Sequence, residues 1–376
     1  MDDLLELRQG IDEIDRQIVE LFEKRMEISS RVAGYKIQTG KKILDKGREE
    51  EKIRALKQMT DDDFNRHGIE ELFKQIMSMS RKLQYRLLAE KGVTGRLAFT
   101  QVENMGFDHA RVVFQGTDGA YSQRAMETFF GEGVSSFHVD TWRDAMVAIQ
   151  EGMADFAVLP IENSTAGIVS EVYDLLVEFD NYIVGEQIIR IENALMGLKG
   201  AELADIRTVY SHPQALMQSS RFLAEHRDWQ IISIRNTAVA AKKVVDEQDK
   251  TQAAIAGKHA AKYYGLHILK DSLNDDKSNS TRFIVVTNQK IYRKEAKKVS
   301  VCFELPHESG SLFNILSHFI YNNLNMTKIE SRPLEGRNWE YRFFVDFEGN
   351  LSGSSVKNAL RGIAEEAINM RILGNY

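Results

Sequence analysis

The chain has 376 residues and a formal net charge of −6, with 43% hydrophobic and 28% charged residues. This length exceeds what one ordinary core needs and predicts two or three globular domains. The negative charge argues against a general nucleic-acid binder, and the absence of a long apolar run or a basic, apolar start argues against membrane insertion and export.

Apolar residues recur every three or four positions in the first segment, which predicts a helix over residues 4–34. A helix of this length favours pairing with a partner chain. Two shorter helices are expected at residues 45–59 and 69–88, separated by a polar loop at 61–68 that ends in glycine. The pattern predicts an all-α domain over residues 1–91.

Residues 92–110 show no firm period, and we expect a linker there. Residues 111–290 then alternate apolar strand-like runs with helical stretches, which predicts an α/β domain with mostly parallel strands and two lobes facing each other across a cleft. The expected strands are residues 111–114, 156–159, 183–185, 208–210, 231–234, 253–256 and 283–286. The expected helices include residues 123–130, 142–151, 213–226 and 238–247.

From residue 297 to 376 the order is strand, helix, strand, strand, helix, strand, which is typical of a ferredoxin-like α+β domain. The expected strands are residues 299–305, 326–331, 341–347 and 370–373, and the expected helices are residues 311–322 and 354–367. Cys302 lies inside the first strand, where we expect a buried structural thiol. As the single cysteine, it excludes an intrachain disulfide and favours a reducing cytoplasm.

Basic residues on the first helix are spaced in a way that predicts an anion site. Arg25 and Lys36 lie 11 positions apart, which places them on nearly the same face, about 16 Å along the helix axis. Arg8 and Arg25 lie 17 positions apart, about 100° around the axis, so one pocket of one chain could not easily use both. Each cation alone is usually a solvated charge, but the joint pattern suggests a cage for a small anion, with Arg8 serving a paired chain.

The polar positions of this segment resemble those of the all-helical chorismate mutase family, whose dimer interlocks long first helices. The resemblance covers residues 1–91. It implies that chorismate, a dianion, is rearranged to prephenate without acid, base or cofactor, by folding the substrate and stabilising charge on its ether oxygen. The substrate-binding positions that it implies are Arg8, Arg25, Lys36, Asp45, Arg48, Glu49, Ser80 and Gln84.

The chemistry assigns roles to these residues. The resemblance implies that Arg25 and, across the dimer, Arg8 capture carboxylates, with Arg48 facing the same anion. Lys36 and Gln84 would donate hydrogen bonds to the ether oxygen, where charge grows only in the transition state. Glu49 would hold the substrate hydroxyl, supported by Asp45 and Ser80.

Four polar motifs lie at strand ends in the α/β segment, at residues 116–122, 160–167, 211–216 and 279–283. Ligands bind at such ends because helix N-termini there present free amides to anions. Each motif alone is more often a turn or a cap, and a Ser–His hydrolase is disfavoured because no Gly-x-Ser-x-Gly elbow is present. In this order the motifs resemble prephenate dehydratase, over residues 111–287.

The dehydratase resemblance implies that prephenate loses its ring carboxylate and its ring hydroxyl together, with no cofactor or metal. Thr281 is expected to hydrogen-bond the leaving hydroxyl. Threonine is too weak an acid to donate a proton unaided, so a proton relay through Glu162 is a hypothesis. The residues expected to position prephenate are Ser122, Asn163, Ser164, Ser211, His212 and Gln214.

Two short motifs in the C-terminal segment resemble the ACT regulatory domain, which binds amino acids at a dimer interface. The effector-binding residues that this implies are Gly310, Ser311, Leu312, Phe313, Glu330, Ser331 and Arg332. Gly310 would let a ligand approach the backbone, and Phe313 is bulkier than the family's valine. The implied effector is L-phenylalanine, acting as a feedback inhibitor.

The leading hypothesis is a bifunctional chorismate mutase and prephenate dehydratase that yields phenylpyruvate. It would be a cytoplasmic homodimer or higher homo-oligomer without nucleic-acid or membrane partners. One alternative is a dehydratase that prefers arogenate. The other is a non-catalytic amino-acid sensor, which would have no need of donors for an ether oxygen.

Overall fold

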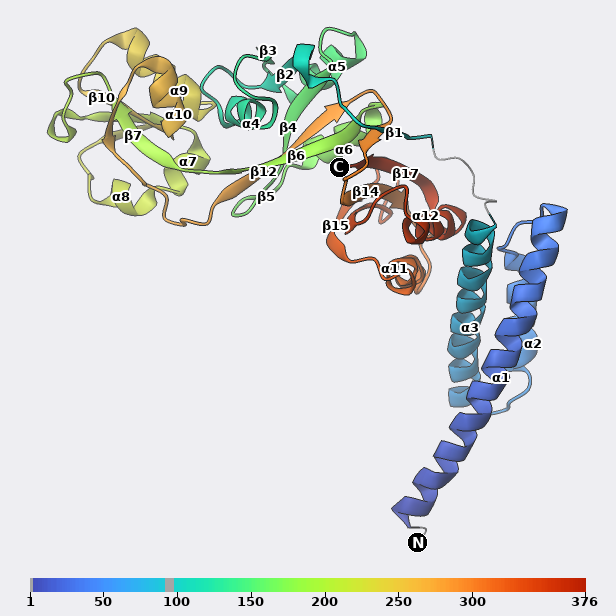
Figure 1. Cartoon of the computed structure of the whole chain (residues 1–376). Coiled ribbons are helices and arrows are strands. Elements are labelled where there is room, and N and C mark those ends of the chain that lie inside the picture. Colours follow the sequence, from blue (N-terminus) through green and yellow to red (C-terminus); the bar gives the residue numbers. More distant parts are fainter. Residues whose placement is uncertain (1–2, 92–97) are drawn as a thin grey trace. The chain divides into compact units, whose positions relative to one another are not determined.

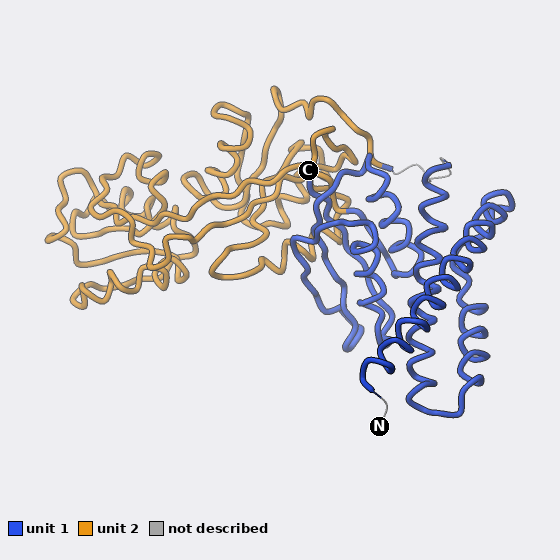
Figure 2. Tube along the Cα trace, turned by 60° about the horizontal axis from the view of Figure 1, so that its bottom comes forward, with its two compact units in different colours: residues 1–98, 297–372 blue, residues 99–296, 373–376 orange. Residues whose placement is uncertain are grey.

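The computed structural model describes residues 3–91 and 98–376. The chain divides into two compact units, coloured separately in Figure 2. Unit 1 consists of residues 1–98 and 297–372, and unit 2 consists of residues 99–296 and 373–376. The C-terminal module therefore belongs to the same unit as the N-terminal helices. No helix within the described residues is both long and apolar enough to cross a membrane.

The N-terminal part of unit 1 is all-α, as predicted, and Figure 1 shows its three helices side by side. They are α1 (Leu4–Thr39), α2 (Lys46–Lys57) and α3 (Asp63–Glu90). The predicted loop at 61–68 is wrong, because Asp62 caps α3 by accepting from the Asn65 N–H and the helix continues through Gly68. Helix α1 ends at Gly40, whose φ of 66° suits a glycine.

The apolar stripe of α1 stays largely uncovered within the chain. Helix α1 packs on α3, and its buried residues, Ser29 and Ala33, both lie in its C-terminal half. Apolar side chains that are each more than half exposed include Leu7, Ile11, Ile14, Ile18, Leu21 and Ile28. A long apolar stripe on an amphipathic helix normally packs against another surface.

The C-terminal module, which belongs to unit 1 up to Ile372, has the predicted ferredoxin-like topology. Its elements are β14 (Lys298–Glu304), α11 (Ser311–Tyr321), β15 (Met326–Pro333), β16 (Tyr341–Glu348), α12 (Ser354–Glu366) and β17 (Ile368–Asn375). The strand order is β15-β16-β14-β17, with β16 antiparallel to both neighbours. Cys302 is buried and free, as predicted, and burial raises its pKa to about 11.

Unit 2 has two lobes, as predicted, each built on its own set of strands. In the first lobe the order is β6-β12-β4-β2-β3, with β2 (Arg111–Gln115), β3 (Ser135–Val139), β4 (Phe156–Asn163), β6 (Tyr182–Arg190) and β12 (Ser280–Thr287). In the second lobe the order is β11-β7-β10-β8-β9, with β7 (Asn193–Gly197), β8 (Thr208–Ser211), β9 (Gln230–Ser233), β10 (Gln252–Gly257) and β11 (His267–Lys270). The chain crosses between the lobes after β6 and again after β11.

The expectation of mostly parallel strands is wrong. The pairs β2–β3, β2–β4, β8–β9 and β8–β10 are parallel, but β12 is antiparallel to both β4 and β6, and β7 to both β10 and β11. The two crossings explain this. The strands β7 and β12 each follow a crossing, so each enters its sheet from the opposite lobe. The helices of unit 2 are α4 (Tyr121–Phe130), α5 (Trp142–Gln150), α6 (Ser170–Glu178), α7 (Pro213–Met217), α8 (Ser220–Ala224), α9 (Thr237–Glu247) and α10 (Lys258–Tyr264).

Two further boundaries differ from the sequence predictions. The predicted helix over 213–226 is interrupted, giving α7 and α8. The predicted linker contains the strand β1 (Thr100–Val102), which pairs in parallel with β13 (Ile291–Arg293), and a 3-10 turn at Phe107–His109. Its residues 92–97 lie outside the described part of the chain. The remaining short elements are β5 (Gly167–Ile168) and the 3-10 turn Leu203–Asp205.

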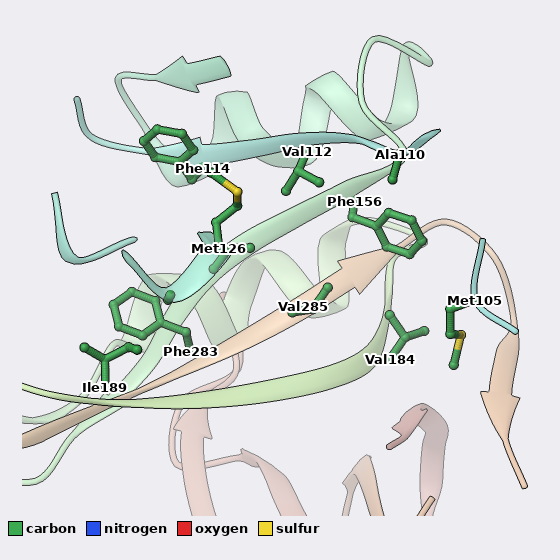
Figure 3. Close-up of a cluster of buried hydrophobic side chains, with 12 residues drawn as sticks. Met105, Ala110, Val112, Phe114, Met126, Phe156, Val184, Ile189, Phe283 and Val285 are labelled. Carbon is green, nitrogen blue, oxygen red and sulfur yellow. The ribbon is translucent and has the colours of Figure 1, made fainter. Parts of the chain in front are cut away.

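The core of the first lobe fixes the strands that carry polar motifs at their ends. Figure 3 shows Phe114 of β2, Phe156 of β4 and Phe283 of β12 within one buried cluster. All three side chains are at most 3% exposed. Because close-packed cores tolerate little displacement, the register between β4 and β12 is held firmly at the point where both strands leave the core.

A buried lysine joins α3 to α11 inside unit 1. Lys82 is 4% exposed, its Nζ donates to Ser317 Oγ at 2.7 Å, and it lies over the ring of Tyr321. Desolvation lowers the pKa of Lys82 from 10.5 to about 8. The folded state therefore holds its proton less tightly than the unfolded state does.

This difference predicts a pH dependence of stability. Between about pH 8 and 10.5 the unfolded chain keeps the Lys82 proton that the folded chain has released, so the stability contribution of Lys82 rises with pH. We expect the thermal midpoint of the wild type to rise relative to Lys82→Met between pH 8 and 10, measured by calorimetry. The exposed Lys42→Met is the control and should follow the wild type. Parallel curves for the wild type and Lys82→Met would contradict the prediction.

Candidate active sites

A cavity of about 880 Å³ in the helical part of unit 1 collects most of the polar residues predicted there. Seven basic side chains and two carboxylates line it, in a chain whose net charge is −6. A locally cationic cavity of this kind concentrates small anions. The predicted residues among its lining are Arg25, Lys36, Asp45, Arg48, Glu49, Ser80 and Gln84.

Hydrogen bonds hold the two central cations in place. Arg25 Nη1 donates to Ser80 Oγ at 2.5 Å, and Lys36 Nζ donates to the Ile43 carbonyl at 2.6 Å. Burial lowers the pKa of both Arg25 and Lys36, although nearby acids oppose this effect. Asp45 has a structural role as well, because its carboxylate caps α2 by accepting from the Arg48 N–H at 3.2 Å.

Gln84 carries an unpaired polar atom in the wall of this cavity. It is 6% exposed, and its Oε1 has no hydrogen-bond partner among the described residues. Exchanging the two ends of the amide would still leave one atom near this position without a partner. A buried amide that lacks a partner is unfavourable, so the geometry suits a residue that bonds a ligand.

Arg8 is the one predicted position that the cavity does not include. Its side chain is exposed on α1. A separation of 17 residues from Arg25 corresponds to about 26 Å along a helix, which is more than an arginine side chain can span. The structure thus brings seven of the eight positions together and leaves the eighth out of reach within one chain.

A second cavity, of about 400 Å³, is lined by residues from both lobes of unit 2. Helices α4 and α9 begin at it, and their free N–H groups favour an anion. The predicted residues in its lining are Ser122, Asn163, His212, Gln214 and Thr281.

Asn163 orients the hydroxyl of Thr281. The side-chain oxygen of Asn163 accepts the backbone N–H groups of Thr165 and Ala166 at 3.1 and 2.9 Å, which settles the orientation of the amide. Its Nδ2 therefore donates to Thr281 Oγ1, at 2.9 Å. The Thr281 oxygen is thus an acceptor for Asn163, and its own proton remains available for a ligand oxygen.

His212 presents a neutral donor to the same cavity. Its Nδ1 accepts the backbone N–H of Gln214 at 3.2 Å and caps α7, so the ring proton sits on Nε2. Burial lowers the pKa of His212 below 6.5. The imidazole is therefore neutral at neutral pH and can donate a hydrogen bond from Nε2.

Ser211 and Ser164 do not line the cavity, contrary to expectation. Ser211 is fully buried and donates to the Ile255 carbonyl at 2.6 Å, so it cannot act as a nucleophile with His212. Ser164 Oγ accepts the Ser280 N–H at 3.0 Å and supports the loop after β4.

Glu162 lies on the wrong face of the sheet for its predicted role. In the pairing of β4 with β12, Asn163 stands opposite Thr281, and Glu162 stands opposite Arg282. Successive side chains of a strand point to opposite faces. Glu162 Oε2 accordingly lies 4.0 Å from Arg282 Nη1. This geometry separates Glu162 from Thr281 and argues against a direct proton relay between them.

The sequence analysis missed Asn193 and Arg235, which also line the second cavity. Asn193 is 1% exposed, its Oδ1 accepts the Tyr121 hydroxyl at 3.0 Å, and its Nδ2 has no partner among the described residues. A buried donor of this kind suits a ligand acceptor. An asparagine that opens the otherwise apolar run 193–197 was the available signal. Arg235, just before α9, could hold a carboxylate.

The residues predicted to bind an effector lie in two places within one chain. Gly310 begins α11 with a φ of 79°, and Ser311 and Leu312 line a cavity of about 360 Å³. The residues of the other motif, Glu330, Ser331 and Arg332, lie on β15, at the edge of the sheet, and are not in this lining.

Two separate cavities suited to small anions, on an all-α domain and on a two-lobed α/β domain, define a multidomain enzyme with two active sites. Residues 7–85 match the chorismate mutase type II family, and residues 112–291 match the prephenate dehydratase family. The chain is 32% identical to a bifunctional chorismate mutase/prephenate dehydratase of Buchnera aphidicola subsp. Schizaphis graminum, over 100% of this chain and 96% of that protein. It is 30% identical to the Escherichia coli K12 protein of that name, over 99% and 96%. The chain belongs to the bifunctional chorismate mutase/prephenate dehydratase family.

Solved structures of similar fold cover 71% of this chain. A prephenate dehydratase from Arthrobacter aurescens in complex with L-Phe has a TM-score of 0.66 and 28% identity, covering 71% of this chain and 89% of that one. GqqA, described as a novel type of quorum quenching acylase, has a TM-score of 0.64 and 31% identity, covering 71% and 97%.

Proposed function

We propose that this chain rearranges chorismate to prephenate in the cavity of unit 1 and converts prephenate to phenylpyruvate in the cavity of unit 2. The observation that carries the proposal is the convergence of seven predicted polar residues on one cationic cavity in a family with these two activities. Loss of chorismate absorbance followed by formation of phenylpyruvate tests both steps on the purified chain.

The first reaction needs binding and charge stabilisation and no proton transfer. Arg25 and Arg48 hold the carboxylates of the dianion and favour its folded conformer. Lys36 and Gln84 donate hydrogen bonds to the ether oxygen as the C–O bond breaks and negative charge grows on it. Because both side chains already line the cavity, little reorganisation is needed in the transition state. The Glu49 carboxylate accepts a hydrogen bond from the substrate hydroxyl.

The mutase cavity is completed by a second copy of the chain. The exposed stripe of α1 supports pairing of two copies along this helix, and the distance of Arg8 from its own cavity supports a role in the partner's cavity. Arg8 would then supply a carboxylate contact that a single chain lacks. The proposed active unit of the mutase is therefore a homodimer.

Complementation between two inactive variants tests this arrangement. Arg8→Ala and Lys36→Ala should each lose mutase activity as homodimers, because every cavity lacks one cation. In a mixed dimer, the intact cavity of the Arg8→Ala chain receives Arg8 from the Lys36→Ala chain. Random mixing makes about half of the dimers mixed, each with one complete cavity, so about a quarter of the wild-type rate should return. No recovery after subunit exchange would contradict the shared site.

The second reaction is an elimination driven by aromatisation. The electron pair of the bond to the ring carboxylate enters the ring as carbon dioxide departs, and the ring hydroxyl leaves with its bonding pair. Thr281, oriented by Asn163, hydrogen-bonds the leaving oxygen while charge develops on it. His212 and Asn193 position the substrate as neutral donors, and Arg235 supplies a cation for its other carboxylate.

Replacing Thr281 by alanine should reduce dehydratase kcat by about 100-fold or more, because a transition-state hydrogen bond is lost. Mutase activity should stay at the wild-type level. The neighbouring Ser280→Ala is a matched control, since Ser280 Oγ bonds the Ser278 carbonyl and lies outside the cavity. Phenylpyruvate formation and chorismate loss are measured on the same preparations. Equal losses of both activities in Thr281→Ala would contradict this division of roles.

The C-terminal ferredoxin-like domain is proposed to be an ACT domain that binds L-phenylalanine between two chains and lowers dehydratase activity. Three facts support this: the left-handed Gly310 at the start of α11, the position of Glu330 and Ser331 on an edge strand, and the L-Phe complex of the Arthrobacter protein. The separation of the two motifs within one chain fits a ligand held between copies.

A Gly310→Ala variant should bind L-phenylalanine at least about 10-fold more weakly in calorimetric titration, because the added Cβ strains a left-handed residue at the ligand. Gly265→Ala is the matched control. Gly265 also has positive φ and open space around it, but it lies in unit 2. Dehydratase activity without phenylalanine should be unchanged in both variants. Unaltered binding by Gly310→Ala would contradict the proposed location.

A further inference from the structure

Arg81 of α3 is a buried cation in the wall of the mutase cavity that no role above explains. It is 8% exposed, and its guanidinium contacts carboxylates from two different elements. Nη1 donates to Glu49 Oε2 of α2 at 2.5 Å. Nε and Nη2 lie 3.1 and 3.0 Å from Glu366 Oε1 of α12. One planar group thus joins a cavity residue to a residue 285 positions away in the sequence.

Opposite charges meet at this junction. Burial by itself lowers the pKa of Arg81, but the carboxylates of Glu366 and Glu49 outweigh it, so its pKa lies above the usual value. Burial likewise raises the pKa of Glu366, but His318 and Arg81 hold it below the usual value. His318 Nε2 lies 3.3 Å from the same Glu366 oxygen. Arg81 and Glu366 are therefore paired as ions at neutral pH.

The C-terminal end of α12 is unfavourable for acidic side chains unless cations or hydrogen-bond donors contact them. Glu365 and Glu366 stand in its last turn, where the helix dipole disfavours negative charge, and that turn contains no basic residue. Each of them has one partner on α3. Tyr85 donates its hydroxyl to Glu365 Oε2 at 2.6 Å, and Arg81 contacts Glu366. The C-terminal module therefore presents a fixed anionic anchor to the helix that carries Arg81.

We propose that Arg81 is a positioning residue of the mutase, which holds the Glu49 carboxylate in the cavity and is itself anchored by Glu366 of the C-terminal module. This inference rests on the proposed mutase function. An arginine can contact two carboxylates through separate edges of its fork, whereas a lysine offers a single point charge. Without Arg81, the Glu49 carboxylate would be free to move and would repel a dianionic substrate.

Full-length variants test this role. In Arg81→Met and Arg81→Lys, mutase kcat/KM should fall by about 10- to 100-fold, because small displacements of a positioned group cost that much. The positive charge that Arg81→Lys retains should not restore the rate. Glu366→Gln should give a smaller loss in the same direction. Dehydratase kcat should be unchanged. Ser317→Ala, which removes the Lys82 bond between α3 and α11 without touching Arg81, should leave mutase activity at the wild-type level.

A double-mutant cycle separates positioning from general destabilisation. If Arg81 acts through Glu49, Arg81→Met should have little further effect on kcat/KM in a Glu49→Gln background. Additive losses, a wild-type rate in Arg81→Lys, or an equal loss in Ser317→Ala would overturn the inference. A wild-type enzyme that does not consume chorismate would instead overturn the proposed function, so the two failures are distinguishable.

Discussion

The mutase site depends on keeping partly buried positive charge available to a small anion. An unpaired buried ion is strongly unfavourable, so each cation needs an oxygen partner before substrate arrives. The structure supplies a serine hydroxyl for Arg25, a backbone carbonyl for Lys36 and two carboxylates, those of Glu49 and Glu366, for Arg81. A neutral hydrogen-bond partner does not cancel the charge on Arg25 or Lys36, and the carboxylates that act on them, chiefly Asp45 and Glu49, offset it only in part. These two cations can therefore bind a dianion strongly once water is excluded.

The dehydratase cavity requires a different distribution of charge from the mutase cavity. A departing carboxylate must lose its charge as carbon dioxide, so strong cations around it would oppose the reaction. The groups fixed near Thr281 are accordingly a hydroxyl, amides and a neutral imidazole, each with its orientation set by a hydrogen bond. Arg235, at the start of α9, is suited to the carboxylate that the substrate keeps. Two cavities in one chain thus differ in charge because their reactions differ.

Several features of unit 1 remain incomplete within one chain. Helix α1 exposes its apolar stripe, Arg8 lies far from its own cavity, and the two motifs proposed to bind an effector are separated. One physical arrangement, pairing of identical chains, would complete all three. Contacts between α3 and α12 also join the mutase helices to the C-terminal module inside each chain. The mutase helices and the proposed regulatory domain therefore share one set of packed helices in unit 1.

The sequence by itself determined the elements and the residue types of the sites. Helical periodicity and spacing are local properties, so they predicted the long first helix, the ferredoxin-like order and the grouping of Arg25 with Lys36. Residues 61–68 were misassigned because a capping aspartate and an internal glycine resemble a loop in sequence.

Only the tertiary structure decided which side chains contact each other and which face of a sheet each strand residue points to. The register of β4 with β12 places Glu162 and Thr281 on opposite faces of the sheet. The fold also buries the side chain of Asn193 and leaves its Nδ2 without a hydrogen-bond partner among the described residues. Arg81 pairs with Glu366, which lies 285 positions away in the sequence. Such pairings depend on how strands cross between lobes and how helices pack. These long-range contacts leave no periodic signal in the chain, which is why the sequence could place the residues but not their contacts.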